Sequence, residues 1–149
     1  MLFRSESGRP VLVVPYAGKF ETLGKRVVVA WNTARESVRA LNDAIPIMCG
    51  AKKVKVVAIN PRQKGKRHGQ IPSADIVQHL IRHGVNAMGD YFDTKGVDDG
   101  NLLLNMVADE HADLLVMGAY GMHRFRELIL GGTTKTVLEQ MTTPVLMSH

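Results

Sequence analysis

One segment near the C-terminus combines glycines and threonines in a spacing suited to holding a phosphate group. It contains, in chain order, Gly118, Gly121, Gly131, Gly132, Thr133 and Thr134. Glycine lets the backbone approach a ligand closely and adopt positive φ, so that successive amide groups point at an anion. A helix expected to begin near Thr133 would add the positive end of its dipole. The residues alone leave one alternative equally open, that these glycines only form tight turns.

Other residues that commonly carry catalysis or bind metals lack a supporting pattern. No Gly-Lys-Ser/Thr follows the glycines, so the segment is not a Walker A loop, and it is not the Rossmann dinucleotide fingerprint. Ser37, Ser73 and Ser148 do not lie in a nucleophile-elbow context. His79 and His83, one helical turn apart, lack a third metal ligand. We therefore expect no catalytic residue and no metal site, and at most slow hydrolysis of a bound nucleotide, because no general base is evident.

Strands and helices alternate from residue 26 onward. Hydrophobic runs predict strands at Arg26–Trp31, Lys53–Ile59, Val85–Phe92, Asp113–Met117 and Pro144–Met147. Periodicity and capping signals predict helices at 33–50 and 73–84, from 98 or 99 onward, and at 133–141. This order favours an α/β fold, a five-stranded doubly wound parallel sheet of the Rossmann-like type. Its binding crevice should lie at the carboxyl ends of the strands.

The first predicted helix carries the most detailed expectations. Thr33 and Glu36 have the spacing of a capping box, and Gly50 offers a C-terminal stop. Pro46 should kink this helix or end it early. Four apolar residues recur at helical intervals and should face the core: Val38, Leu41, Ile45 and Met48.

A short segment before the first unit repeats the sequence of the last strand. Arg9–Pro15 reads Arg-Pro-Val-Leu-Val-Val-Pro and resembles Thr143–Met147, which reads Thr-Pro-Val-Leu-Met. We therefore expect an extra N-terminal strand. This divides the chain into residues 1–24, a strand and linker remaining from a tandem repeat, and residues 25–149, a single domain.

Length and composition narrow the class of protein. With 149 residues, 45% of them hydrophobic and 22% charged, the chain can bury one core and is neither disordered nor fibrous. Its apolar runs fall far below the roughly 20 residues that span a bilayer, and no secretory signal is evident, so we expect a cytoplasmic protein. Cys49 is the only cysteine, which excludes an internal disulfide. The net charge of +5 favours anionic partners, but the basic loop 62–68 lacks interleaved aromatics and fits a solvated loop better than nucleic-acid binding.

The glycine segment resembles that of the universal stress protein family, whose ATP-binding members carry Gly, two residues, Gly, nine residues, Gly, then Ser or Thr. Gly118, Gly121 and Gly131 fit this spacing, and the resemblance extends from Arg26 to His149. It implies a universal stress protein domain over residues 25–149, a homodimer formed through the last strands, and ATP as cofactor, with or without Mg²⁺. The function it implies is ATP-binding stress-response regulation. The alternative is a nucleotide-free dimeric interaction module of the same fold.

Two substitutions set this sequence apart from the family pattern. Asn32 and Thr33 follow the first predicted strand where the family has Asp-Gly-Ser, so an amide replaces a carboxylate. Gly132 replaces the small hydroxyl residue after the third glycine, although Thr133 and Thr134 can supply a hydroxyl group.

The resemblance also implies a role for one residue outside the glycine segment. Ala58 occupies the place of a valine that lines the adenine pocket, and an ordinary small core residue is an equally open interpretation. Two arginines within the glycine segment, Arg124 and Arg126, could pair with phosphates through their planar guanidinium groups. A solvated basic face is the alternative for Arg124 and Arg126.

Overall fold

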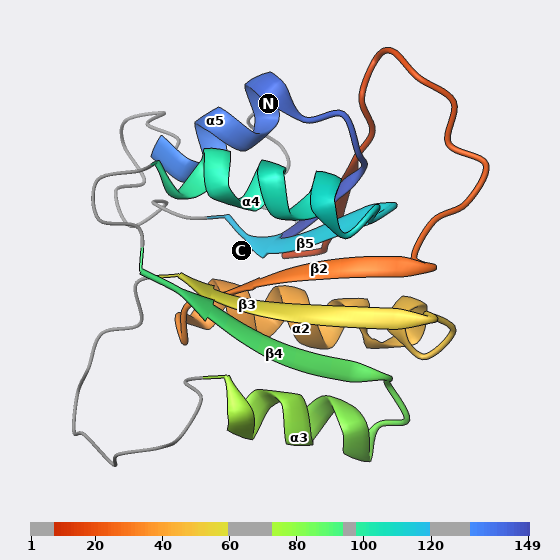
Figure 1. Cartoon of the computed structure of the whole chain (residues 1–149), viewed down its shortest axis with the longest axis vertical. Coiled ribbons are helices and arrows are strands. Elements are labelled where there is room, and N and C mark those ends of the chain that lie inside the picture. Colours follow the sequence, from red (N-terminus) through yellow and green to blue (C-terminus); the bar gives the residue numbers. More distant parts are fainter. Residues whose placement is uncertain (1–7, 60–72, 94–97, 120–131) are drawn as a thin grey trace.

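The computed structural model describes residues 8–59, 73–93, 98–119 and 132–149. These residues form one six-stranded sheet with helices on both faces (Figure 1). Its strands are β1 (Val11–Val13), β2 (Arg26–Trp31), β3 (Lys53–Ile59), β4 (Ala87–Phe92), β5 (Leu114–Gly118) and β6 (Val145–Ser148). Their order across the sheet is β1-β6-β5-β2-β3-β4. All neighbouring pairs are parallel except β1 and β6, which are antiparallel.

The central strands are buried on both faces, because helices cover each side of the sheet. On one face α2 (Arg35–Met48) and α3 (Ala74–Arg82) pack on Val27, Val29 and Trp31 of β2 and their neighbours. On the other face α4 (Asp99–Asp109) and α5 (Gly132–Gln140) pack on Val28 and Ala30. The continuous apolar sequence of β2 follows from this double coverage. No helix in the described part of the chain is long and apolar enough to cross a membrane.

The predicted doubly wound parallel sheet and its extra N-terminal strand are confirmed. β2 and β3 have the predicted bounds, while β4 begins at Ala87 rather than Val85. Asp98 is the N-cap of α4, and its carboxylate accepts a hydrogen bond from the amide of Asn101 at 3.0 Å. Gly84 follows α3 with φ of 82°, the conformation for which a glycine stop is suited.

Two expectations for α2 are wrong, and of the two outcomes expected at Pro46 the early end is excluded. Thr33 does not cap the helix, because its φ is 62° and the N-cap residue is Ala34. Val38 is 38% exposed, because the buried stripe of α2 runs through Ala40 and its helical neighbours. Pro46 does not end the helix early: it is exposed in the last turn, and the helix continues to Met48.

Ser73 is the N-cap residue of α3, at the predicted start of this helix, but its hydroxyl makes no capping hydrogen bond. The side chain is fully buried, and its oxygen has no hydrogen-bond partner among the described residues. It lies against Gly89 of β4, where a β-carbon would collide with it. Gly89 therefore lets α3 approach the strand closely.

Asp113 joins the amino ends of β2 and β5. Its carboxylate accepts hydrogen bonds from the Thr22 hydroxyl at 2.7 Å, the Lys25 amide at 3.1 Å and the Arg26 amide at 2.9 Å. Partial burial opposes ionisation of Asp113, but these hydrogen bonds outweigh it and hold the pKa of the carboxyl below its ordinary value. These hydrogen bonds hold the segment that leads into β2 against the start of β5.

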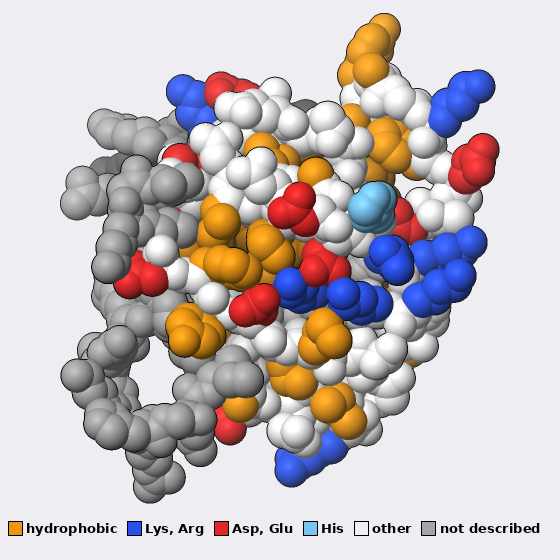
Figure 2. Space-filling view, in the orientation of Figure 1, with side chains coloured by type: hydrophobic (Ala, Val, Ile, Leu, Met, Phe, Trp, Pro, Cys, Tyr) orange, Lys and Arg blue, Asp and Glu red, His pale blue; other side chains and the backbone are white. Residues whose placement is uncertain are grey.

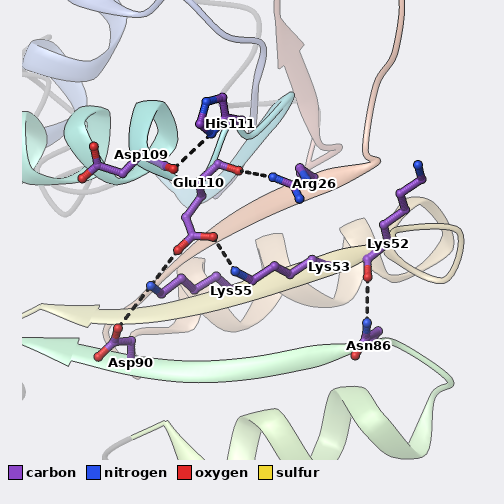
Figure 3. Close-up of polar contacts among 9 residues, drawn as sticks. All are labelled: Arg26, Lys52, Lys53, Lys55, Asn86, Asp90, Asp109, Glu110 and His111. Atoms are coloured by element: carbon purple, nitrogen blue, oxygen red, sulfur yellow. Dashed lines mark hydrogen bonds and ion pairs between the residues drawn. The ribbon is translucent and has the colours of Figure 1, made fainter.

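Glu110, at the end of α4, binds two lysines of β3 (Figure 3). Its carboxylate oxygens lie 2.6 Å from Lys53 Nζ and 2.8 Å from Lys55 Nζ, and Lys55 also lies 3.2 Å from Asp90 of β4. Hydrogen bonds from Lys53 and then Lys55 lower the pKa of Glu110 to about 2. Figure 2 shows acidic and basic side chains side by side in the middle of this face of the molecule. The ion pairs join the end of α4 to β3 and β4.

Candidate functional site

The carboxyl ends of β2 and β5 meet near the centre of the sheet. From β2 the chain moves outward through β3 and β4, and then returns to β5 and β6 on the other side. Neighbouring strands whose connections leave in opposite directions form a topological switch point, which is where open α/β sheets bind ligands. Asn32 and Thr33 directly follow β2, Gly118 ends β5, and Ala58 lies near the end of β3. The fold therefore brings four of the predicted site residues to one edge of the sheet.

The turn between β2 and α2 is held by the side chain of Asn32. Its Oδ1 accepts a hydrogen bond from the amide of Ala34 at 3.0 Å. Thr33, between them, adopts φ of 62°, a left-handed conformation that is costly for a β-branched residue. Both Asn32 and Thr33 are exposed. Because Ala34 is the N-cap and carries no oxygen acceptor, the positive end of α2 faces this edge without a side-chain cap from its N-cap residue.

Gly118 allows the end of β5 to pack directly on the first turn of α2. A β-carbon at this position would lie 2.6 Å from the amide nitrogen of Ser37 and 2.7 Å from the carbonyl carbon of Glu36. Glycine is thus required at position 118 because two backbones approach each other closely, and not because φ is positive. This contact places the end of β5 beside the amino end of α2.

The start of α5 carries three more predicted residues, and the structure separates them. Gly132 is exposed, and no atom of the described residues lies within 4 Å of the point that a β-carbon would occupy, while Thr133 is half-buried. Thr134 is only 1% exposed, so its hydroxyl is turned into the protein. Of the two threonines, Thr133 is therefore the better placed to meet a ligand.

Gly100 of α4 lets the first turns of α4 and α5 touch. A β-carbon there would lie 2.7 Å from Cβ of Thr136 and 3.0 Å from the carbonyl oxygen of Thr133. The sequence analysis did not identify this residue. The signal that could have identified it is a glycine inside a helix. Glycine costs about 1 kcal/mol there relative to alanine, so its presence indicates that something else requires it.

Ala58 is a core residue on the α2 and α3 side of the sheet. It is 2% exposed and pairs with Trp31 of β2 and Tyr91 of β4. The structure thus places it next to the switch point, in the same apolar cluster as Trp31. Any contact with a base would be made across its small methyl group.

The remaining predicted site residues, Gly121, Arg124 and Gly131, lie outside the described residues, as do Arg126 and the predicted loop 60–71. Within the described ranges, no three His, Cys, Asp or Glu side chains are arranged to hold a metal ion. His79 and His83 pack ring on ring at 4.4 Å between centroids, and each makes a hydrogen bond to a neighbouring oxygen.

The C-terminal part of the sequence matches a known family model. Residues 89–149 match the universal stress protein family. This span contains β5, β6 and α5, and therefore half of the switch point. No curated protein sequence matches the chain.

Solved universal stress proteins have the same fold as this chain. It is similar to UspA from Lactobacillus plantarum, with 13% identity over 87% of this chain and 100% of that chain, at a TM-score of 0.66. A universal stress protein from Archaeoglobus fulgidus DSM 4304 has 19% identity and a TM-score of 0.72, covering 93% of this chain but 49% of that chain. A third, from Archaeoglobus fulgidus in complex with dAMP, has 19% identity over 83% of this chain and 97% of that chain, at a TM-score of 0.60.

Proposed function

We propose that this chain binds ATP at the carboxyl edge of its sheet and acts as a stress-response regulatory protein. The observation that carries the proposal is the switch point, where Gly118 holds the end of β5 against the uncapped amino end of α2. Amide groups at a helix N-terminus and a positive dipole favour phosphate. A relative with the same fold, from Archaeoglobus fulgidus, was solved in complex with dAMP, an adenine nucleotide.

The proposed roles follow from the position of each residue. Asn32 and Thr33 are exposed beside β2 and would meet the ligand with their polar side chains. Ala58 would contact the adenine base. Gly118 shapes the floor, and Gly121, Arg124 and Gly131 would complete the phosphate loop. Gly132 and Thr133 would meet the phosphates at the start of α5, with Thr134 supporting them from within.

The lack of a negative charge at Asn32 limits how the protein would bind Mg²⁺. Asn32 offers an amide oxygen that already accepts the hydrogen bond of Ala34, and it carries no negative charge. Mg²⁺ would therefore be held mainly by the phosphates of the nucleotide and by water, which is its usual preference. We propose Mg²⁺ as part of the ATP complex, in a cytoplasmic protein that hydrolyses ATP slowly or not at all.

A second candidate function is a nucleotide-free dimeric interaction module. Two observations favour it: Thr134 is buried and Ala58 is packed in the core, as residues with a purely structural role would be. Mass spectrometry of ligand released from the purified, denatured protein separates the two functions. An adenine nucleotide at near-stoichiometric amount is expected for the first, and its absence together with no ATP binding in calorimetry supports the second.

A charge placed on Gly132 tests the site itself. Because the position is exposed and no atom of the described residues lies near its β-carbon position, Gly132→Asp should fold normally, while its carboxylate repels the phosphates. We expect ATP affinity to fall at least tenfold in Gly132→Asp, as in Gly121→Asp, and to rise in Gly132→Ser, which supplies a hydroxyl group.

Gly50→Asp is the matched control for these substitutions. Gly50 is exposed beyond the end of α2, at the opposite edge of the sheet, and has an ordinary backbone conformation. The added charge is the same, so its ATP affinity should equal that of the unchanged protein. Equal affinity in folded Gly132→Asp would contradict the assignment of the phosphate site.

A further inference from the structure

β1 covers the outer edge of β6. The two strands are antiparallel, with Val11 opposite Met147, Leu12 opposite Leu146 and Val13 opposite Val145. Since β5 lies on the other side of β6, removal of β1 would leave β6 as an exposed edge of the described sheet. Exposed edges pair readily with other strands.

β1 is also a sequence copy of the strand that it covers. Aligning Pro10-Val-Leu-Val with Pro144-Val-Leu-Met makes Leu12 the counterpart of Leu146. The observed register pairs these two counterparts with each other. A strand that pairs with an identical copy of itself about a two-fold axis has this register, because its central residue faces its own copy. β1 therefore lies where β6 of a second molecule would lie.

The apolar side chains of β1 are less buried than their counterparts in β6. Leu12 and Leu146 are directly opposite and so share one face of the sheet, the face covered by α2. Leu146 is 6% exposed, whereas Leu12 is 40% exposed and Val14 is 52% exposed. A second molecule would bring its own α2 together with its β6, and would cover the apolar face that β1 leaves open.

Contacts at the end of the pairing hold β1 in place. Arg39 of α2 donates one hydrogen bond to the carbonyl oxygen of Gly8, just before β1, and another to the carbonyl oxygen of His149, just after β6. On the opposite face Val13 packs with the α4 and α5 cluster. The covering strand is thus anchored at its start and by one half-buried valine.

We propose that β1 is an intramolecular cover that controls self-association, and that the partner it excludes is a second copy of this chain, paired β6 to β6 about Leu146. A tethered strand competes at an effective concentration on the order of millimolar, so the covered monomer prevails in dilute solution. Release of β1 exposes the edge and yields the dimer. This inference is independent of nucleotide binding.

Val13→Asp tests the proposal by weakening the cover without shortening the chain. Its carboxylate would be placed in the half-buried apolar position, so β1 should detach and light scattering should find a dimer. Val14→Asp adds the same charge at a position that is already 52% exposed, and this variant should remain monomeric, like the unchanged chain. Deletion of residues 1–17 removes the cover entirely and should give the same dimer, which provides a second route if Val13→Asp does not fold.

The register is tested with a single cysteine in a Cys49→Ser background. With β1 detached by Val13→Asp, Leu146→Cys should form a disulfide between two chains, because residue 146 faces its own copy at a distance suited to a disulfide. Met147→Cys should not, because it faces residue 145 of the second chain. Monomeric Val13→Asp and truncated proteins without a 146–146 disulfide would overturn the proposal. The proposal would also be overturned if the unchanged chain is already a dimer and if cysteines at positions 12 and 146, in the variant with Leu12→Cys and Leu146→Cys, form a disulfide between two chains.

Discussion

The amino edge and the carboxyl edge of the sheet, where the parallel strands begin and end, are stabilised by different means. At the amino edge, Asp113 accepts hydrogen bonds from three groups and Glu110 binds two lysines. At the carboxyl edge, Gly118 provides a tight backbone contact, while Asn32 and Thr33 are exposed and Thr33 is held in an unfavourable conformation. The difference indicates that charged groups satisfied within the protein fix one edge, and that the other keeps polar groups available to a ligand.

The largest expected effect comes from filling the glycine contact at the carboxyl edge. Gly118→Ala should destabilise the protein by about 3 kcal/mol, because the added methyl group meets backbone atoms that cannot move independently. Gly132→Ala is the control: no atom of the described residues lies near the added methyl group, so the free energy of unfolding should not fall. Urea unfolding measures both. A Gly118→Ala protein as stable as the control would show that the two backbones are not in close contact.

Asp113→Ala tests the amino edge. It leaves the Thr22 hydroxyl and the amides of Lys25 and Arg26 without their acceptor, and should cost about 2 kcal/mol of stability. Asp109→Ala, an exposed position at the end of α4, should change stability little. ATP affinity, measured by calorimetry below the unfolding transition, should be the same in both variants. A loss of ATP affinity in Asp113→Ala alone would contradict the assignment of stability to the amino edge and ligand binding to the carboxyl edge.

The pH dependence of stability should reveal Glu110. Its pKa in the folded protein, about 2, lies below the ordinary value of 4.5, so its stabilisation is present above pH 4.5 and is lost as the pH falls toward 2. Glu110→Gln should therefore cost about 1–2 kcal/mol at neutral pH, allowing for solvent screening, and almost nothing near pH 2. Urea unfolding across this range checks the prediction. A stability difference that does not depend on pH would exclude the lysine contacts as its cause.

The smallest effect is expected at Thr33. Thr33→Gly should stabilise the protein by about 1 kcal/mol, because glycine adopts φ of 62° without strain. If the Thr33 hydroxyl meets the nucleotide, ATP affinity should fall in the same variant. Thermal unfolding and calorimetry on one preparation measure both quantities, and a loss of stability would contradict the strained conformation.

The sequence predicted the parts of this fold that depend on local patterns. The apolar runs of β2 and β3, the start of α4 at 98 or 99 and the end of α3 at Gly84 each depend on neighbouring residues, and the structure confirms them. Parts that depend on distant residues were missed or wrong. The capping box at Thr33 failed because the Asn32 side chain holds the turn instead, and Val38 failed because helical spacing alone does not fix the width of the buried stripe.

The candidate site could be predicted as a location but not as a set of contacts. Strand order alone places Asn32, Thr33, Ala58 and Gly118 at one edge. The reason for Gly118, a contact with α2 much earlier in the chain, depends on tertiary packing that no local pattern contains. The burial of Thr134 likewise depends on how α5 packs against the sheet.

Nuclear magnetic resonance of the ¹⁵N-labelled chain during ATP addition tests the account most directly, because each backbone amide reports separately. We predict saturable shifts for the amides of Asn32, Thr33, Gly118 and Gly132 at the carboxyl edge. The amides of Arg26, Glu110 and Asp113 at the amino edge should not shift. Saturable shifts confined to the amino edge, or none at any amide at millimolar ATP, would contradict nucleotide binding at the switch point.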